Sequence, residues 1–183
     1  MGSSKQLLEY KGKSLLNHTI DHALKSHANQ VIVVLGYENQ RIQGEIENCD
    51  AVKIIVNPEW SLGMGNSVKY GVRYVQRELH VDFAILTVCD QPFIHAEIFN
   101  ELMMCSNQNA DSIIVCTYAD GTRGVPVLFP KRYFVHILSI PDTAGAKSVW
   151  SGKDSEITGI TFKEGAFDID TPSDVEKLLR RSR

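Results

Sequence analysis

Apolar residues follow two alternating patterns along this chain. Continuous runs rich in β-branched residues, such as the run from Val31 to Leu35, are typical of strands buried on both faces of a parallel sheet. Stripes that recur every three or four positions, such as Leu15, Leu16 and Ile20, indicate amphipathic helices. We expect strands at 30–36, 52–56, 83–90, 112–117, 125–129 and 158–162. We expect helices at 14–28, around 42–46, and at 68–75, 96–105, 131–138 and 171–179.

This order of elements predicts an α/β fold, a three-layer α/β/α sandwich with a mainly parallel, Rossmann-like sheet. Pro126 limits its strand to an edge or bulged position because proline cannot donate to a sheet ladder. Thr171 and Pro172 form an N-cap and first-turn pair for the last helix. With 183 residues and 43% of them hydrophobic, the chain suits one domain, residues 1–183.

Composition and charge exclude several classes of partner. The net charge of −3 and the lack of a basic cluster, apart from the tail Arg180–Arg183, argue against nucleic acid. No apolar run reaches membrane-spanning length and the first residues lack a signal-peptide core, so we expect a cytoplasmic protein. The cysteines form no C-x-x-C pair and are expected to be reduced, mostly buried thiols. The oligomeric state stays open.

Asp90 is the first candidate functional residue because an apolar run ends on it. Pro92 follows closely and stops the predicted strand. Ligands of open α/β sheets gather beyond the carboxyl ends of the strands, and a carboxylate there suits a hard cation such as Mg²⁺. An aspartate that merely begins a turn is an equally good interpretation of this segment alone.

Asp170 also follows a strand-like stretch, the residues Ala166 to Ile169. If both stretches end at the same rim of the sheet, Asp90 and Asp170 hold one Mg²⁺ between them. The alternative for Asp170 is an acid at a helix N-terminus beside Thr171, which taken in isolation is the better interpretation.

Three segments offer groups for anionic substrates. Lys5 follows Gly2 in a small flexible run, a pattern that suits phosphate contacts but also marks an ordinary terminus. The loop 59–67 offers a nucleoside site, or only a capped helix with Asn66 or Ser67 as N-cap. The loop 121–126 offers a cation to an anionic acceptor, or is only a turn between strands.

Taken in order, these pieces resemble the MobA-like nucleotidyltransferase family, within it the molybdenum cofactor cytidylyltransferase branch. The matching segments cover nearly the whole chain. They are Met1-Gly2-Ser3-Ser4-Lys5-Gln6-Leu7-Leu8, Asn57-Pro58-Glu59-Trp60 before Gly63-Met64, Cys89-Asp90-Gln91-Pro92, Gly124-Val125-Pro126-Val127-Leu128-Phe129 and Asp168-Ile169-Asp170-Thr171-Pro172.

The resemblance implies a fold of the nucleotide-diphospho-sugar transferase type and transfer of a nucleotidyl group from CTP, or another NTP, to a phosphorylated acceptor such as molybdopterin. Pyrophosphate is released. Lys5 and Asp90 would be catalytic, and Asp90 with Asp170 would bind Mg²⁺. The implied nucleotide-binding residues are Gly2, Lys5, Gly63, Met64, Gly65, Asn66, Ser67 and Asp90. The implied acceptor-binding residues are Gln91, Pro92, Arg123, Gly124, Val125 and Pro126.

The chain departs from the family pattern in three places. It begins inside the opening motif, without the family's first strand and glycine-rich loop, so we expect the native protein to start upstream. An intact mass equal to these 183 residues would contradict that expectation. Val125 stands where the family often has a polar residue, and Lys147 stands in place of an arginine. Because lysine lacks a bidentate fork, the choice of acceptor is left open.

Two alternatives remain beside the leading interpretation. One is a carrier of the same fold that binds a nucleotide or cofactor without transferring a group. The other is a cytidylyltransferase that acts on another phosphorylated metabolite. The identity of the nucleotide base and the true N-terminus are also left open by the sequence.

Overall fold

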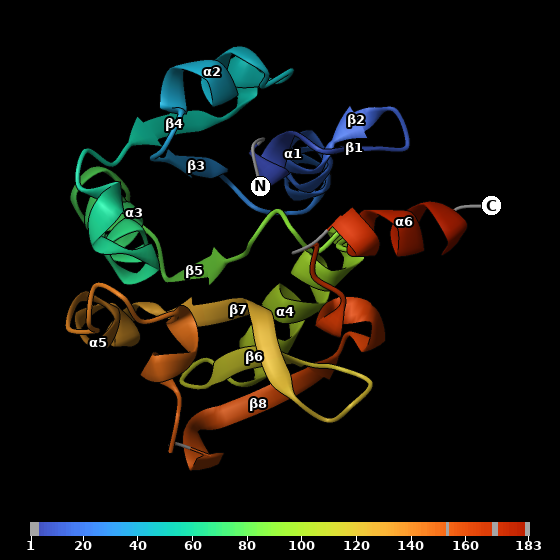
Figure 1. Cartoon of the computed structure of the whole chain (residues 1–183). Helices are drawn as coiled ribbons and strands as arrows, with labels where there is room; N and C mark the ends of the chain where they lie inside the picture. The colour runs from blue at the N-terminus through green and yellow to red at the C-terminus, as the bar shows by residue number, and fades with distance from the viewer. Residues whose placement is uncertain (1–3, 153, 170–171, 182–183) are drawn as a thin grey trace.

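The computed structural model describes residues 4–152, 154–169 and 172–181, arranged as strands covered by helices (Figure 1). The helices are α1 (Leu15–Lys25), α2 (Asn39–Gly44), α3 (Met64–Glu78), α4 (Ala96–Gln108), α5 (Phe134–Leu138) and α6 (Pro172–Arg181). The strands are β1 (Glu9–Tyr10), β2 (Lys13–Ser14), β3 (Ile32–Leu35), β4 (Lys53–Val56), β5 (Phe83–Leu86), β6 (Ile113–Thr117), β7 (Arg123–Pro130) and β8 (Ile157–Thr161). Short 3-10 turns include η1 (Lys5–Leu7), η3 (Trp60–Leu62) and η7 (Lys163–Ala166).

The largest sheet has the strand order β5-β7-β6-β8. β7 is antiparallel to both β5 and β6, whereas β8 is parallel to β6. β5, β6 and β8 therefore share one direction and β7 alone opposes them. The parallel pair β3–β4 and the small antiparallel hairpin β1–β2 complete the strands. The predicted α/β fold with a mainly parallel sheet is confirmed, and the hairpin was not predicted.

β7 shows which of the two expectations for Pro126 was right. The strand lies between β5 and β6, so the edge position is wrong. A register shift between Val115 and Cys116 of β6 marks the irregularity that accommodates it, so the bulge is confirmed. Proline is tolerated inside the sheet because the ladder is already broken at that point.

Helices cover the sheet on both faces, and the alternation of side chains along β6 decides what each face meets. Ile113 and Val115 pack into a cluster with α3 and α5. Ile114 and Cys116 point the other way, into a cluster with α4. A third cluster joins α1 and α2 to β3. These contacts produce the expected three layers, as Figure 1 also shows.

Among the described residues the strands do not form one continuous sheet, because β3 and β5 each have a partner strand on one side only. In the β5–β7 ladder the Lys131 N–H donates to the Asp82 carbonyl (2.8 Å). Hydrogen-bonded and non-bonded pairs alternate along an antiparallel ladder, so the backbone N–H and C=O groups of Phe83 and Ile85 point away from β7. By the same alternation, Ile32 and Val34 point their backbone groups away from β4. In Figure 1, β5 lies below β3 and no labelled strand lies between them.

Two boundaries differ from the sequence expectation. β5 ends at Leu86 rather than Asp90. The next ladder bond would use the Val125 carbonyl, which instead accepts the Tyr118 hydroxyl (2.7 Å). Helix α3 begins at Met64 with Gly63 as its N-cap, so neither Asn66 nor Ser67 is the cap that the alternative interpretation of loop 59–67 required. Among the described residues, no helix is long and apolar enough to cross a membrane.

Candidate functional site

Lys5 and Asp90 form the centre of the candidate site. Lys5 lies in η1 and Asp90 follows β5, yet Lys5 Nζ is 2.5 Å from Asp90 Oδ2. The two side chains are 36% and 19% exposed, so a substrate or an ion can reach them. The fold therefore joins the predicted phosphate-binding cation to the predicted metal ligand, which the sequence placed 85 positions apart.

The segment that leads to the second predicted metal ligand also lies beside Asp90. The backbone N–H of Ile169 donates to the Asp90 carbonyl (2.9 Å). Ile169 is fully buried, which anchors the end of this segment against the core. Asp170 itself lies outside the described residues, as does Gly2. The two-carboxylate metal site thus stays a prediction, although the stretch that precedes Asp170 reaches the expected rim.

The donor set at Asp90 suits a hard cation. Asp90 Oδ2 is paired with Lys5, while Oδ1 has no hydrogen-bond partner among the described residues and can coordinate an ion. Magnesium commonly uses one or two protein carboxylates and completes its shell with water and phosphate oxygens. No group of three or more His, Cys, Asp or Glu side chains suited to a metal occurs in the described part of the chain.

Cys89, the neighbour of Asp90, is a packing residue. Burial raises the pKa of its thiol to about 12, and the negative charge of Asp90 acts in the same direction. The thiolate that nucleophilic chemistry needs is therefore scarce at neutral pH. Cys89 is a free and partly buried thiol, as expected of a packing residue.

The predicted acceptor residues Gln91 and Val125 are joined by a tyrosine that the sequence analysis missed. Gln91 is 3% exposed and its Nε2 donates to Tyr118 Oη (2.9 Å). The Tyr118 hydroxyl in turn donates to the Val125 carbonyl (2.7 Å), and the Val125–Pro126 peptide is cis. The available signal was position, because Tyr118 directly follows the apolar run 112–117 and so lies at the carboxyl end of a strand.

The other predicted acceptor residues lie in two places, at the start of β7 and beside a small hollow. Arg123 begins β7 on the same rim, and its guanidinium pairs with Asp154 (2.6 Å). Gly124 follows it in β7. Pro92 is buried and lies with Tyr10 and Phe93 around a small hollow, so its contact with an acceptor stays a prediction.

The predicted nucleoside segment, Gly63 to Ser67, packs against the loop that follows α5. A side chain on Gly65 would lie 2.3 Å from the Pro141 carbonyl, so only glycine fits there. Asn66 is buried, donates to Asp142 Oδ1 (3.0 Å) and accepts from the fully buried Asn57 (2.9 Å). The Asn66 side chain thus has a structural role, while Met64 is 62% exposed and free to meet a ligand.

Asp142 completes this loop contact electrostatically. Lys69 Nζ lies 2.7 Å from Asp142 Oδ1 and 3.0 Å from the Ile140 carbonyl. The hydrogen bond from Lys69, and then that from Asn66, holds the pKa of the Asp142 carboxyl below its usual value. The loop that follows α5 is therefore fixed to the first half of α3.

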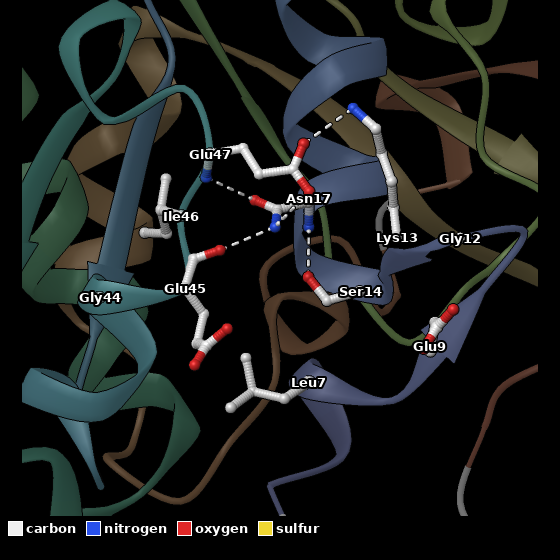
Figure 2. Close-up of a pocket in the computed structure, with 10 residues that line it drawn as sticks. All are labelled: Leu7, Glu9, Gly12, Lys13, Ser14, Asn17, Gly44, Glu45, Ile46 and Glu47. Atoms are coloured by element: carbon white, nitrogen blue, oxygen red, sulfur yellow. Dashed lines mark hydrogen bonds and ion pairs between the residues drawn. The ribbon is translucent and has the colours of Figure 1, made fainter.

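A separate pocket of about 370 Å³ opens between the β1–β2 hairpin, α1 and the end of α2 (Figure 2). Its lining includes Glu9, Glu45 and Glu47 but only one cation, Lys13. Lys13 is already engaged by Asp21 (2.6 Å) and Glu47 (3.0 Å), contacts that raise the pKa of its ammonium. An acid-lined pocket repels a triphosphate, so the candidate nucleotide site remains at Asp90.

Comparison with characterised proteins gives two relatives of nearly full length. The chain is 28% identical to the molybdenum cofactor cytidylyltransferase of Escherichia coli (strain K12), over 95% of this chain and 86% of the relative. It is 25% identical to the purine catabolism protein PucB of Bacillus subtilis (strain 168), over 98% of this chain and 90% of the relative.

Comparison with solved structures supports the fold, and one of the similar structures was solved with a metal ion. An Rv0371c homologue from Mycobacterium sp. strain JC1 is 27% identical, with a TM-score of 0.80 over 99% of this chain and 89% of that one. Rv0371C from Mycobacterium tuberculosis H37Rv, solved as a complex with manganese, is 24% identical, with a TM-score of 0.78 over 96% of this chain and 91% of that one. Both neighbours share the α/β fold of this chain.

Residues 1–157 match the family described as the MobA-like NTP transferase domain. The match includes Lys5, Asp90 and the segment 123–126, whose geometry is described above. On this evidence the chain belongs to the MobA-like NTP transferase domain family.

Proposed function

We propose that this protein transfers CMP from CTP to a small phosphorylated acceptor such as molybdopterin, in a Mg²⁺-dependent reaction that releases pyrophosphate. The observation that carries the proposal is the Lys5–Asp90 pair at 2.5 Å on the carboxyl rim of the sheet. It combines an ammonium for phosphate oxygens with a carboxylate for a divalent ion. The 28% identity to a molybdenum cofactor cytidylyltransferase supports the choice of nucleotide and acceptor.

In the proposed reaction an acceptor phosphate oxygen attacks the α-phosphorus of the nucleotide, and the bond from the α-phosphorus to the bridging oxygen breaks. Pyrophosphate leaves with that bond's electron pair. Lys5 would hold the triphosphate and stabilise the charge that develops on the departing pyrophosphate. Asp90 would be the principal protein ligand of Mg²⁺, which supplies charge neutralisation when it is bound. Gln91 and the segment 123–126 would orient the acceptor, since positioning contributes much of the rate in such transfers.

The test is pyrophosphate release with each NTP, Mg²⁺ or Mn²⁺, and candidate phosphorylated acceptors, measured on this chain and on one extended by the residues encoded directly upstream. We expect release with CTP, and about a 10²- to 10³-fold loss of turnover in Asp90→Asn with the fold retained. Asp111→Asn is the matched control, because it removes a carboxylate from an exposed ion pair with Arg132.

Two outcomes would contradict the proposal. Pyrophosphate release that is unchanged in Asp90→Asn would remove Asp90 from the reaction. Calorimetric binding of a nucleotide with no turnover for any NTP and acceptor would instead identify a carrier of this fold.

A further inference from the structure

Tyr118 is bonded to two separate segments of the candidate site and, through Gln91, linked to a third. Its hydroxyl accepts from Gln91 Nε2 (2.9 Å) and donates to the Val125 carbonyl (2.7 Å). Gln91 Nε2 also donates to the Gly165 carbonyl of η7 (2.7 Å). The Tyr118 phenol and the Gln91 amide thus connect the segment that follows β5 with the start of β7 and with η7.

The ring of Tyr118 fits closely against two glycines. A Cβ on Gly124 would lie 2.1 Å from Tyr118 Oη, and a Cβ on Gly165 would lie 2.2 Å from Tyr118 Cε1. Phe162 meets the ring edge-on, with centroids 6.2 Å apart at 81°. Because neither glycine can carry a side chain while the ring stays in place, the tyrosine is seated directly on the backbone of both segments.

The orientation of the Gln91 amide is set by these contacts. Its nitrogen must face Gly165 because a carbonyl only accepts, and Gln91 Oε1 is then buried with no hydrogen-bond partner among the described residues. The two bonds that Nε2 donates therefore fix the orientation of the Gln91 amide.

The contacts also lead back to Asp90. Gln91 holds Gly165, the chain continues from Gly165 to Ile169, and Ile169 N–H donates to the Asp90 carbonyl (2.9 Å). Burial, the main cause, raises the pKa of Tyr118 to about 12, so its hydroxyl remains a donor to Val125 across the neutral range. A displacement of the Tyr118 hydroxyl would therefore shift both the segment 123–126 and the backbone that is bonded to Asp90.

We propose that Tyr118 is a positioning residue that fixes the segment Gly124–Pro126 relative to Asp90 and so sets the affinity for the phosphorylated acceptor rather than for the nucleotide. This inference rests on the proposed function for its kinetic consequence. Its structural consequence, the fixed position of residues 121–126 and 163–165, is independent of any activity.

The decisive variant is Tyr118→Phe, which removes the hydroxyl and keeps the ring between Gly124, Gly165 and Phe162. We expect the KM for the acceptor to rise about tenfold or more while the KM for the nucleotide stays unchanged. Amide hydrogen exchange should accelerate in residues 121–126 and 163–165 and stay unchanged in the centre of β6. Tyr133→Phe is the matched control, since its buried hydroxyl bonds to Glu156 outside the candidate site.

A double-mutant comparison separates positioning from general loosening. In a Gln91→Met background, Tyr118→Phe should raise the acceptor KM by less than it does in the wild type, because the two side chains share one hydrogen bond. Equal rises in both KM values, or fully additive effects, would overturn the inference. If the wild-type chain shows no turnover, the proposed function fails, and unchanged hydrogen exchange in Tyr118→Phe would separately overturn the role of Tyr118.

Discussion

The sheet system has one region that is closed and one that is open. β6 and β7 have partners on both sides, and Ile114, Leu128 and Phe129 are 0% exposed. In the part of the chain that the structure describes, β3 and β5 have a partner strand on one side only, and every residue of β5 is partly exposed. Asp90 and Gln91 follow β5, so the candidate site lies at the end of the open region.

The difference teaches that an apolar composition does not by itself bury a strand. β5 and β6 are similarly apolar, but no described strand pairs with the second edge of β5, where its backbone N–H and C=O groups need partners. Helix α3 still spans the interruption, because Gly71 approaches the Val34 side chain of β3 while Val72 packs in the cluster that contains Phe129. The covering layer is therefore more continuous than the sheet beneath it. Local opening is expected to start at β3 and β5.

The largest expected effect compares one aromatic residue from each region. Phe129→Ala in β7 should lower the free energy of unfolding by about 3 to 5 kcal/mol, because it leaves a cavity in a fully packed site. Phe83→Ala in β5 should cost less than half as much, because Phe83 is only partly buried. Chemical denaturation of both variants measures the difference. Equal losses would mean that β5 is as well enclosed as β7.

The second prediction is that an added strand stabilises the open region. An extended apolar segment joined ahead of residue 1 should pair with β3 and β5, because Ser4 and Lys5 are bonded to Glu38 and Asp90 at the ends of these strands. Each new backbone hydrogen bond contributes about 0.5 to 1.5 kcal/mol, so we expect a total gain of about 2 to 4 kcal/mol. Hydrogen exchange of the backbone amides on the open edges measures the pairing, at Ile32, Val34, Phe83 and Ile85.

The control for the added strand is the same segment with proline at alternate positions, which cannot donate to a ladder. Equal protection of β3 and β5 by both segments would show that the gain comes from nonspecific apolar contact. Protection by the proline-free segment alone would show that β3 and β5 can pair with a strand between them.

The smallest expected effect concerns the loop that is fixed to α3. Hydrogen bonds from Lys69 and Asn66 lower the pKa of Asp142 in the folded protein. The ionised carboxylate therefore stabilises the fold at pH values above 3.8, the usual pKa of an aspartate. That contribution is lost as the pH falls through the lower folded-state pKa. Asp142→Asn should therefore show a slightly smaller drop in Tm than the wild type between neutral pH and about pH 3. Thermal melts across this range give the comparison, and parallel curves would contradict it.

The sequence by itself determined the kind and order of most elements. Ser14 accepts a hydrogen bond from Asn17 N–H as the N-cap of α1, and Ile42 and Ile46 are buried as the pattern required. Capping and hydrophobic periodicity act over a few residues, so they can be read locally. The Asp90 segment was also found locally, because an apolar run that ends near a proline marks the rim of a sheet.

Only the tertiary structure decided which distant groups meet. Strand order determines the central position of β7 and the interruption between β3 and β5. It also brings Lys5 to Asp90. The Tyr118 contacts involve Gln91 and Gly165, which lie far from Tyr118 in the sequence, and the Asn66–Asp142 bond joins residues 76 positions apart. Such contacts form because the packing of whole layers brings them together, and no local pattern of side chains encodes that packing.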